Sequence, residues 1–301
     1  MLNRRNKLLL LKVLSLFSVV RGYNILVITL AQYLASIYIL APELPVRQVL
    51  FDLNLFVLVT ASALAIAGGY IINNFYDAEK DIINKPSKSM LDRLVSQRFK
   101  LTTYFMLNFM AVFAASYASF KAVLFFSAYI FGIWFYSHKL KRIPFVGNLV
   151  SATLAITPFF AVFVYYKNFD TVIFAHAMFL FLLILAREMI KDLENMSGDM
   201  AQNYRTIPIL YGVGRSKGLI FTLIVLTLVP SLLLIYTFDV GLMTYYFVMC
   251  IVLLLVFLVL LIKSHTKRHF VWLHNILKFI IVAGVFSILL IDVDLVLNRI
   301  L

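Results

Sequence analysis

Long uncharged, mostly apolar windows alternate with polar connections along this chain. Each window approaches the roughly 20 residues that a helix needs to cross about 30 Å of hydrocarbon. The fourth and sixth are short and are expected to extend as helices into their polar flanks. The windows are 24–41, 53–76, 101–119, 122–136, 145–166, 172–186, 218–238, 240–262 and 270–291. The pattern predicts an all-α membrane protein with nine transmembrane helices.

Composition supports the same class. The mean hydropathy is +0.96 and only 14% of the 301 residues are charged, too few to cover the surface of a water-soluble domain. No stretch rich in Pro, Gly or Ser divides the chain, so residues 1–301 are expected to form one membrane domain. The single cysteine, Cys250, lies in an apolar window, which excludes an intrachain disulfide and a cysteine metal site.

Basic residues give a formal net charge of +13, but their placement is uneven. The segment before the first window and every second connection after it carry 22 of the 27 Lys and Arg residues. Cytoplasmic segments carry such an excess, so the N-terminus is predicted in the cytoplasm and the C-terminus, with Arg299, outside a bacterial or archaeal cell membrane. Because Lys12 interrupts its apolar run, the N-terminal segment is predicted as an interfacial helix. A nucleic-acid partner is not expected, and no obligate protein partner is evident.

Oxygen donors follow the second window at helical spacing. Asn73, Asp77 and Asp81 lie at i, i+4 and i+8, so on a continuous helix each is rotated by only about 40° from the one before. All three therefore share one face at the predicted boundary between hydrocarbon and cytoplasm. Carboxylates at such a boundary are costly unless something binds them.

A second stripe of oxygen donors follows the sixth window, on the same predicted side of the membrane. Glu188, Asp192, Asn195 and Asp199 recur at offsets of four, three and four residues, which again makes one helical face. Lys191 lies about 100° from this stripe and is expected among lipid headgroups. The two connections that carry the stripes hold eight of the fourteen acidic residues.

Hard oxygen donors without His or Cys suit Mg²⁺, which completes its shell with water and phosphate oxygens. Two facing stripes have enough donors for two or more Mg²⁺ ions around a diphosphate. Arg205, six residues beyond Asp199, is a candidate phosphate clamp, and Arg21 and Asn24 are polar groups near the expected cavity level. Two alternatives stay open: carboxylate stripes also line ion pathways in cation-coupled transporters, or only cap helix ends.

Three segments resemble the signatures of the UbiA superfamily of intramembrane prenyltransferases. They are "NNFYDAEKD" followed by "INKP", "DLENMSGD" followed by "RTIPILYGVG", and "FYSHKLKRIPFVGNL". Their order and spacing, together with nine spans, extend the resemblance over essentially the whole chain. The second signature departs at one position, because Asn195 stands where the family usually has Asp. An amide oxygen still coordinates a metal ion, but more weakly.

The resemblance implies a role for each motif residue. Asn73, Asp77 and Asp81 are expected to form a first Mg²⁺ site, and Asp192, Asn195 and Asp199 a second, around a central cavity open to the cytoplasmic side. The four aspartates are the expected catalytic residues. Lys141, with Tyr136 nearby, is expected to hold the diphosphate or shield the organic cation, and Arg21, Asn24, Asn73 and Arg205 complete the expected substrate-binding set.

The family chemistry is Mg²⁺-dependent transfer of a polyprenyl group from an allylic prenyl diphosphate to a lipophilic acceptor. The runs "REMIKDLENMSGD" and "DIINKP" are most similar to the branch that alkylates geranylgeranylglycerol phosphate, an ether-lipid precursor. Aromatic quinone precursors, hydroxybenzoate or naphthoate, are the alternative acceptors. A cation-coupled transporter is the alternative of another class, although no internal repeat with broken helices is clear.

Overall fold

The computed structural model describes residues 4–292, and within this range the regular elements are all helices. Nine of the described helical segments are long and apolar enough to cross a membrane, which confirms the predicted fold class. They are α2 with η1 (Gly22–Leu40), α4 (Leu53–Tyr76), α7 (Gln97–Ala118), α8 (Phe120–His138), α9 (Val146–Tyr166), α10 (Thr171–Ala201), α11 (Ile207–Tyr236), α12 (Met243–Lys263) and α13 (Lys267–Ser287) with η3, ending at Leu290. The predicted outer position of Arg299 and the C-terminus lies outside the described residues.

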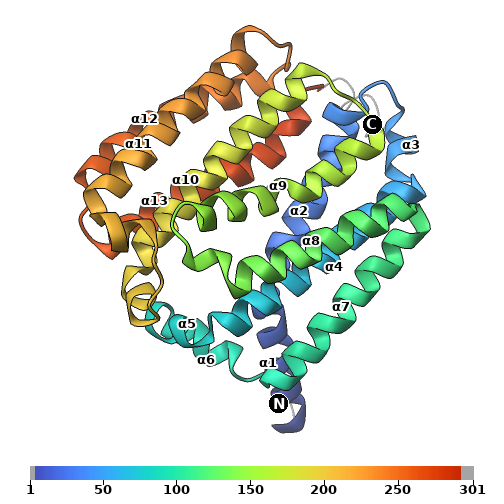
Figure 1. Cartoon of the computed structure of the whole chain (residues 1–301). Coiled ribbons are helices and arrows are strands. Elements are labelled where there is room, and N and C mark those ends of the chain that lie inside the picture. Colours follow the sequence, from blue (N-terminus) through green and yellow to red (C-terminus); the bar gives the residue numbers. More distant parts are fainter. Residues whose placement is uncertain (1–3, 293–301) are drawn as a thin grey trace.

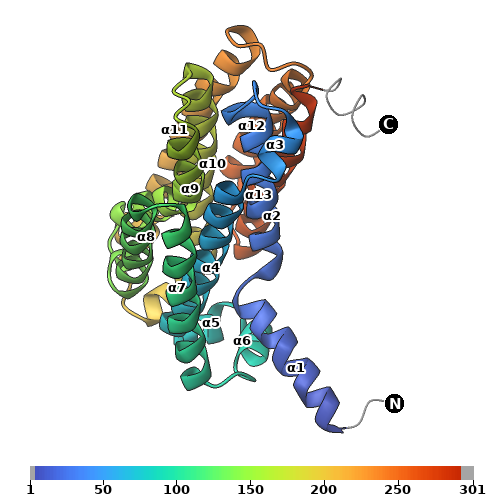
Figure 2. The ribbon, with the colours of Figure 1, turned by 90° about the vertical axis from the view of Figure 1, so that its right-hand side faces the viewer.

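Shorter helices lie at the two ends of this bundle. A helix is present in the predicted interfacial segment, and it leans away from the bundle at its lower end (Figure 2). The short elements are α1 (Arg4–Val19), α3 (Val46–Leu50), α5 (Ala78–Asn84), α6 (Pro86–Asp92) and η2 (Leu140–Arg142). Of these, α5 and α6 lie at the same end as α1 (Figure 1).

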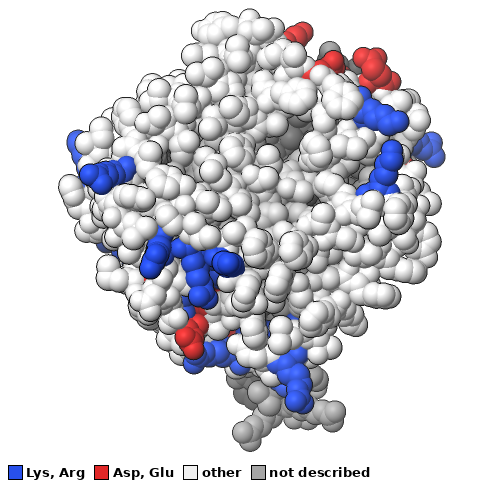
Figure 3. All heavy atoms as spheres, viewed as in Figure 1, with Lys and Arg blue, Asp and Glu red and all other residues white. Residues whose placement is uncertain are grey.

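The long helices form two groups, each with its own apolar core. In one group α10, α11, α12 and α13 pack around residues such as Phe247 and Leu254. In the other, α4, α7 and α8 pack around Ala65, Ala111 and Phe126. Helix α9 contacts both α8 and α10 (Figure 1). Lys and Arg side chains on the face in Figure 3 gather toward its ends, and the middle band is uncharged.

Close approach of α4 to its neighbours depends on two glycines. A Cβ on Gly68 would lie 2.7 Å from Asn108 Oδ1 on α7, and one on Gly69 would lie 2.9 Å from Ile133 Cγ2 on α8. Any side chain there would force the helices apart, so both glycines serve close helix packing.

A proline inside α9 leaves a backbone carbonyl without its usual helical donor. Pro158 has no N–H to give to Leu154 O, and the Tyr129 hydroxyl on α8 donates to that carbonyl instead (3.1 Å). From α2, Gln32 Nε2 donates to the Pro158 carbonyl (2.9 Å). These bonds satisfy buried backbone oxygens and join α2, α8 and α9.

Helix ends differ from the sequence prediction mainly at two places, the start of α11 and the first oxygen stripe. Helix α10 runs past the apolar window to Ala201, as expected for a short window, whereas α11 begins at Ile207, eleven residues before its predicted window, and is kinked at Gly212 (φ 83°). The expectation of one continuous helix through the first oxygen stripe is wrong, because the backbone leaves helical geometry at Asp77 (φ −92°, ψ 1°) between α4 and α5. Asp81 therefore lies on a separate short helix.

A buried network of polar side chains, here called the hub (Ser18, Asn74, Lys88, Asp92 and Lys100), connects the short helices α1 and α6 to α4 and α7. Asn74 Nδ2 donates to Asp92 Oδ2 (2.8 Å), and Lys100 Nζ, only 2% exposed as a residue, donates to Asn74 Oδ1 (2.9 Å). Lys88 pairs with the same Asp92 carboxylate (2.9 Å), and Ser18 of α1 donates to its other oxygen (3.1 Å). The hub joins α1, α4, α6 and α7.

Candidate active site

A chamber of about 230 Å³ lies between the two helix groups. Its polar walls come from the end of α4, from α5, η2 and α10, and from the segment after α10. Apolar residues of α2, α4, α8 and α9, such as Ile28, Ile66 and Leu154, line it farther from these polar groups. The chamber therefore joins a charged region to an apolar one.

Asp77 is the centre of the charged part. Its Oδ1 accepts a hydrogen bond from Lys141 Nζ at 2.7 Å, and it lies 3.4 Å from both Lys80 Nζ and the Tyr204 hydroxyl. The break between α4 and α5 places the carboxylate at the chamber wall rather than on a helix surface. Burial alone would raise the pKa of Asp77, but the ammonium groups of Lys80 and Lys141 outweigh it and hold that pKa well below its usual range.

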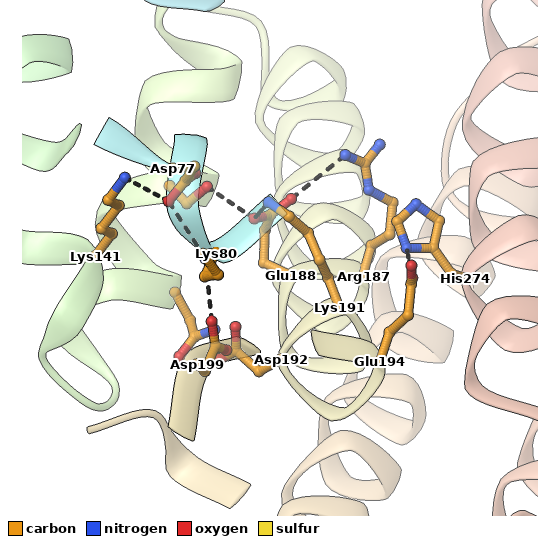
Figure 4. A network of polar contacts seen from close by, with 12 residues as sticks. Asp77, Lys80, Lys141, Arg187, Glu188, Lys191, Asp192, Glu194, Asp199 and His274 are labelled. Atoms are coloured by element: carbon orange, nitrogen blue, oxygen red, sulfur yellow. Dashed lines mark hydrogen bonds and ion pairs between the residues drawn. The ribbon is translucent and has the colours of Figure 1, made fainter. Parts of the chain in front are cut away.

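Lys80 connects the two oxygen stripes. Its Nζ lies 3.4 Å from Asp77 Oδ1 and 3.1 Å from Asp199 Oδ1, so both carboxylates face one point (Figure 4). The two negative partners raise the pKa of Lys80 against the opposing effect of burial. Burial lowers the pKa of Lys141 to about 8, with Asp77 opposing the shift. The tertiary fold thus brings together two sequence segments that are more than 100 residues apart.

The second stripe lies along one face of α10, and all four of its oxygen-bearing residues line the chamber. Asp192 Oδ2 accepts a hydrogen bond from Asn148 Nδ2 of α9 (2.8 Å). Asn195 Oδ1 is buried and, among the described residues, has no hydrogen-bond donor. A buried, unsatisfied amide oxygen costs free energy unless a further group binds it.

Asn84, at the end of α5, joins the segment of the first oxygen stripe to α10, which carries the second stripe. Its side-chain amide donates to Asn195 O (3.2 Å) and its Oδ1 accepts from the Gly198 N–H (3.1 Å), so it bonds the backbone of α10 from the end of α5. A Cβ on Gly198 would lie 2.3 Å from Asn84 Nδ2, so only glycine allows this approach. The docking holds Lys80 and Asp77 opposite Asp199.

The structure brings most of the predicted site residues to one chamber. Eight of them line it: Arg21, Asn73, Asp77, Tyr136, Lys141, Asp192, Asn195 and Asp199. Their individual roles remain predictions. Three others do not line it, namely Asn24, Asp81 and Arg205. Asn24 is linked to the chamber indirectly, because its Nδ2 donates a hydrogen bond to the hydroxyl of Tyr70, a chamber residue (3.2 Å). Arg205 is exposed, and its backbone N–H donates to the Arg142 carbonyl (3.1 Å).

Sequence reasoning missed several charged and polar chamber residues. Lys80 was detectable in principle, since it follows Asp77 by one helical turn, but nothing local to Tyr204 marks it. The Tyr204 ring lies 4.6 Å from Lys80 Nζ and 5.0 Å from the Arg142 guanidinium, and covers the cations. Lys191, expected among lipid headgroups, instead lines the chamber and donates to Glu188 Oε2 (2.9 Å), so that expectation is wrong.

The donor set fits Mg²⁺ in its chemistry. Of the predicted metal ligands, three carboxylates and two amides line this one cavity, and the amide oxygen of Asn195 has no donor among the described residues. Within the described part of the chain, no sulfur or imidazole group lines the cavity. No group of three or more His, Cys, Asp or Glu residues is already gathered closely enough to hold a metal ion in the described part of the chain. Lys80 occupies the point between Asp77 and Asp199, and would have to yield it to a metal ion.

Fold and site together define a class: an all-helical integral membrane protein whose buried chamber combines oxygen donors, cations and apolar walls. A model of the UbiA prenyltransferase family matches residues 29–280. The chain belongs to the UbiA prenyltransferase family and is a membrane prenyltransferase of that family. Family membership sets aside the transporter alternative.

Named relatives and solved structures agree with this family assignment. The chain is 37% identical to the digeranylgeranylglyceryl phosphate synthase of Thermococcus sibiricus over 55% of this chain and 59% of that protein. It is 27% identical to the enzyme of the same name from Methanobrevibacter smithii, over 80% of this chain and 83% of that protein. The match to the Thermococcus protein thus spans less than two thirds of its length.

Two solved structures share the fold over nearly the whole chain. A structure described as digeranylgeranylglyceryl phosphate synthase in membranes is 21% identical and superposes with a TM-score of 0.69 over 92% of this chain and 97% of that one. A UbiA homologue from Archaeoglobus fulgidus bound to GPP and Mg²⁺ is 14% identical, with a TM-score of 0.66 over 91% of this chain and 99% of that one.

Proposed function

We propose that the protein transfers a polyprenyl group from an allylic prenyl diphosphate to the free hydroxyl of geranylgeranylglycerol phosphate. The observation that carries this is the pair of facing oxygen stripes in one chamber, bridged by Lys80 and flanked by Lys141. The ether-lipid acceptor is favoured over an aromatic one because the relatives above that carry an enzyme name are digeranylgeranylglyceryl phosphate synthases.

The chain's own residues account for most of the chemistry. When bound at these oxygens, Mg²⁺ would stabilise the negative charge of the leaving diphosphate. Lys141 and Lys80 point at the same place and would bind the phosphate oxygens by charge-assisted hydrogen bonds. As the allylic C–O bond breaks, the diphosphate leaves with the bonding electron pair, the acceptor hydroxyl oxygen forms an ether bond to that carbon, and the hydroxyl proton passes to the departing diphosphate.

The chamber walls suit an allylic cation. Tyr70, Tyr129 and Tyr136 line it, and aromatic rings attract cations. Apolar side chains such as Ile66 and Ile133 exclude water, which would otherwise react with the cation. A second, almost wholly apolar cavity of about 280 Å³ is lined by α2, α9, α10, α12 and α13, and has the composition needed for a hydrocarbon tail.

The orientation follows from charge. The chamber's charged end includes Asp77 and Lys80, which belong to the connection after α4, and that connection is among the basic ones. We therefore place this end on the cytoplasmic side of an archaeal or bacterial cell membrane. Donor and acceptor would enter from the membrane, since both carry long apolar chains.

The test is a product assay. Purified protein in liposomes is incubated with Mg²⁺, labelled geranylgeranyl diphosphate, and either geranylgeranylglycerol phosphate, hydroxybenzoate or naphthoate, and products are identified by mass spectrometry. We expect the diether from the first acceptor alone, and its loss on chelation of Mg²⁺ or in Asp77→Asn. Prenylated aromatic product, with no ether formed, would contradict the acceptor; no allylic diphosphate turnover with any acceptor would contradict the reaction.

A further inference from the structure

A second group of charges lines the chamber apart from the Asp77 and Asp199 carboxylates. Arg187 Nη2 lies 3.3 Å from Glu188 Oε1, and Lys191 Nζ lies 2.9 Å from Glu188 Oε2. Ser151 of α9 also donates to Glu188 Oε2 (3.1 Å). Figure 4 shows this group, here called the inner cluster (Arg187, Glu188 and Lys191), on the side of the chamber away from Lys141.

The inner cluster lies beside the proposed diphosphate site but consists of other cations. At 1.5 Å rise per residue along α10, Glu188 lies about 16 Å from Asp199 and about 6 Å from Asp192, the nearest proposed metal ligand. Lys80 and Lys141 make their ion pairs with Asp77 and Asp199, whereas the cations of the inner cluster pair with Glu188. The chamber therefore has two positively charged subsites at different depths.

Cations exceed carboxylates at this inner subsite. Two cations share the single Glu188 carboxylate, and the guanidinium of Arg21 also lines the chamber and repels Lys191. Arg21 lies over the Tyr70 ring (5.1 Å) and makes no ion pair with a carboxylate among the described residues. Arg187 Nε is buried without a hydrogen-bond acceptor in the described part of the chain. Three half-buried cations against the Glu188 carboxylate leave a net charge of +2 here, with Asp192, one turn farther along α10, counted among the proposed metal ligands. Such a surplus of positive charge in a cavity attracts an anion.

Backbone geometry fixes Arg21 at this place. It has a left-handed conformation (φ 51°, ψ 53°) between α1 and α2, which is uncommon for a non-glycine residue. The turn directs its side chain to the chamber, where it packs on Tyr70.

We infer that the inner cluster, with Arg21, binds the phosphate monoester of the acceptor, and so selects phosphate-bearing lipid alcohols over neutral ones. The inference rests on the proposed function. A phosphate monoester carries close to two negative charges at neutral pH, which matches the net charge of +2. The planar guanidinium groups of Arg187 and Arg21 can donate hydrogen bonds to the phosphate oxygens. In a glycerol phosphate the reacting hydroxyl lies one carbon from the phosphate-bearing carbon. Anchoring the phosphate here holds that hydroxyl beside the donor.

The first test separates acceptor binding from donor binding. In Arg187→Gln we expect KM for geranylgeranylglycerol phosphate to rise about ten-fold or more, as for loss of a charged hydrogen bond, with KM for the prenyl diphosphate unchanged. Lys217→Gln, which removes a cation that bonds the Ile262 and Ser264 carbonyls away from the chamber, is the matched control and should change neither KM. Equal rises in both KM values, or no rise, would overturn the inference.

The second test separates a phosphate subsite from a purely structural ion pair. In Glu188→Gln the three cations lose their competing carboxylate, so we expect KM for the phosphate acceptor to fall, opposite to the effect of Arg187→Gln. A structural ion pair would be weakened by either change, and both variants would then impair the enzyme in the same direction. That result would overturn the inference.

The third test uses the unmodified protein. Glycerol 1-phosphate should inhibit competitively against the acceptor but not against the prenyl diphosphate, and the acceptor without its phosphate should have a much higher KM. Inhibition competitive with the diphosphate would place the phosphate in the wrong subsite and overturn the inference. Failure of the proposed function looks different, because unmodified protein would then form no ether from any acceptor.

Discussion

At the scale of single residues, the two adjacent asparagines of "NNFYD" do different work. Asn73 lines the chamber, whereas Asn74, 9% exposed, bonds Asp92 and Lys100 in the hub beneath the bundle. Sequence alone assigned Asn73 to the site by its spacing with Asp77, but it gave no role to Asn74. The hub depends on Asp92 and Lys100, which lie on other helices, and no local pattern indicates them.

Substitution of these two asparagines should affect stability and turnover in opposite ways. Asn74→Ala leaves Asp92 and Lys100 short of a partner and should lower the free energy of unfolding by roughly 1–3 kcal/mol, with turnover per folded molecule retained. Asn73→Ala should keep the melting temperature and lose most of the turnover. Thermal melting and prenyl transfer by the same two preparations check this. Loss of turnover without destabilisation in Asn74→Ala would contradict the assignment.

Asn195 is the other informative residue. Its side-chain oxygen is buried without a donor among the described residues, in a stripe otherwise made of carboxylates. Asn195→Asp adds a negative charge to the proposed metal site, so the Mg²⁺ concentration at half-maximal activity should fall roughly ten-fold. Metal-free protein should lose stability, since the added charge faces Asp192 and Asp199.

A titration of activity against Mg²⁺ measures the effect of Asn195→Asp. Asn203→Asp, the same charge change at an exposed position outside the chamber lining, is the control and should leave the titration unchanged. An unchanged titration in Asn195→Asp would show that residue 195 is not a metal ligand.

At the scale of elements, the site depends on how α5 docks against α10. Hydropathy located α4 and the start of α10 to within a few residues, because a membrane span has a length and a composition that a sequence displays. Local spacing predicted neither the break at Asp77 nor the bridge by Lys80, which pairs with Asp199 on another helix. The Asn84 contacts with the backbone of α10, which hold α5 in place, are likewise tertiary. Facing stripes can thus be proposed from spacing, whereas their mutual distance depends on tertiary contacts.

This docking makes Gly198→Ala a sharp test. The new methyl group would overlap the Asn84 amide, cost about 1–3 kcal/mol, and move Lys80 and Asp77 away from Asp199. We expect lower stability together with loss of activity. Gly218→Ala in α11, where a Cβ meets nothing within 4 Å, should be neutral or slightly stabilising. Full activity in Gly198→Ala would contradict the role given to the α5–α10 contact.

At the scale of the whole molecule, the fold places charge at the ends and an apolar band between them (Figure 3). The uneven distribution of Lys and Arg is the basis for the proposed orientation, and two exposed residues flanking α12 test it. Asp239 precedes α12 and His265 follows it, so one span separates them. In a variant without Cys250, Asp239→Cys should react with an impermeant maleimide in intact cells, and His265→Cys only after permeabilisation. The reverse pattern would place the chamber outside.

The most direct measurement of the central claim is a structure with Mn²⁺, in place of Mg²⁺, and a non-hydrolysable prenyl diphosphate analogue, with the metal located by anomalous scattering. The account predicts metal peaks in the chamber about 2.1 Å from oxygens of both motifs, including Asp77 and Asp199, with Lys80 Nζ moved from between those carboxylates to the diphosphate. Metal peaks only outside the chamber, or Lys80 still joining Asp77 to Asp199 in the presence of metal and diphosphate, would contradict it.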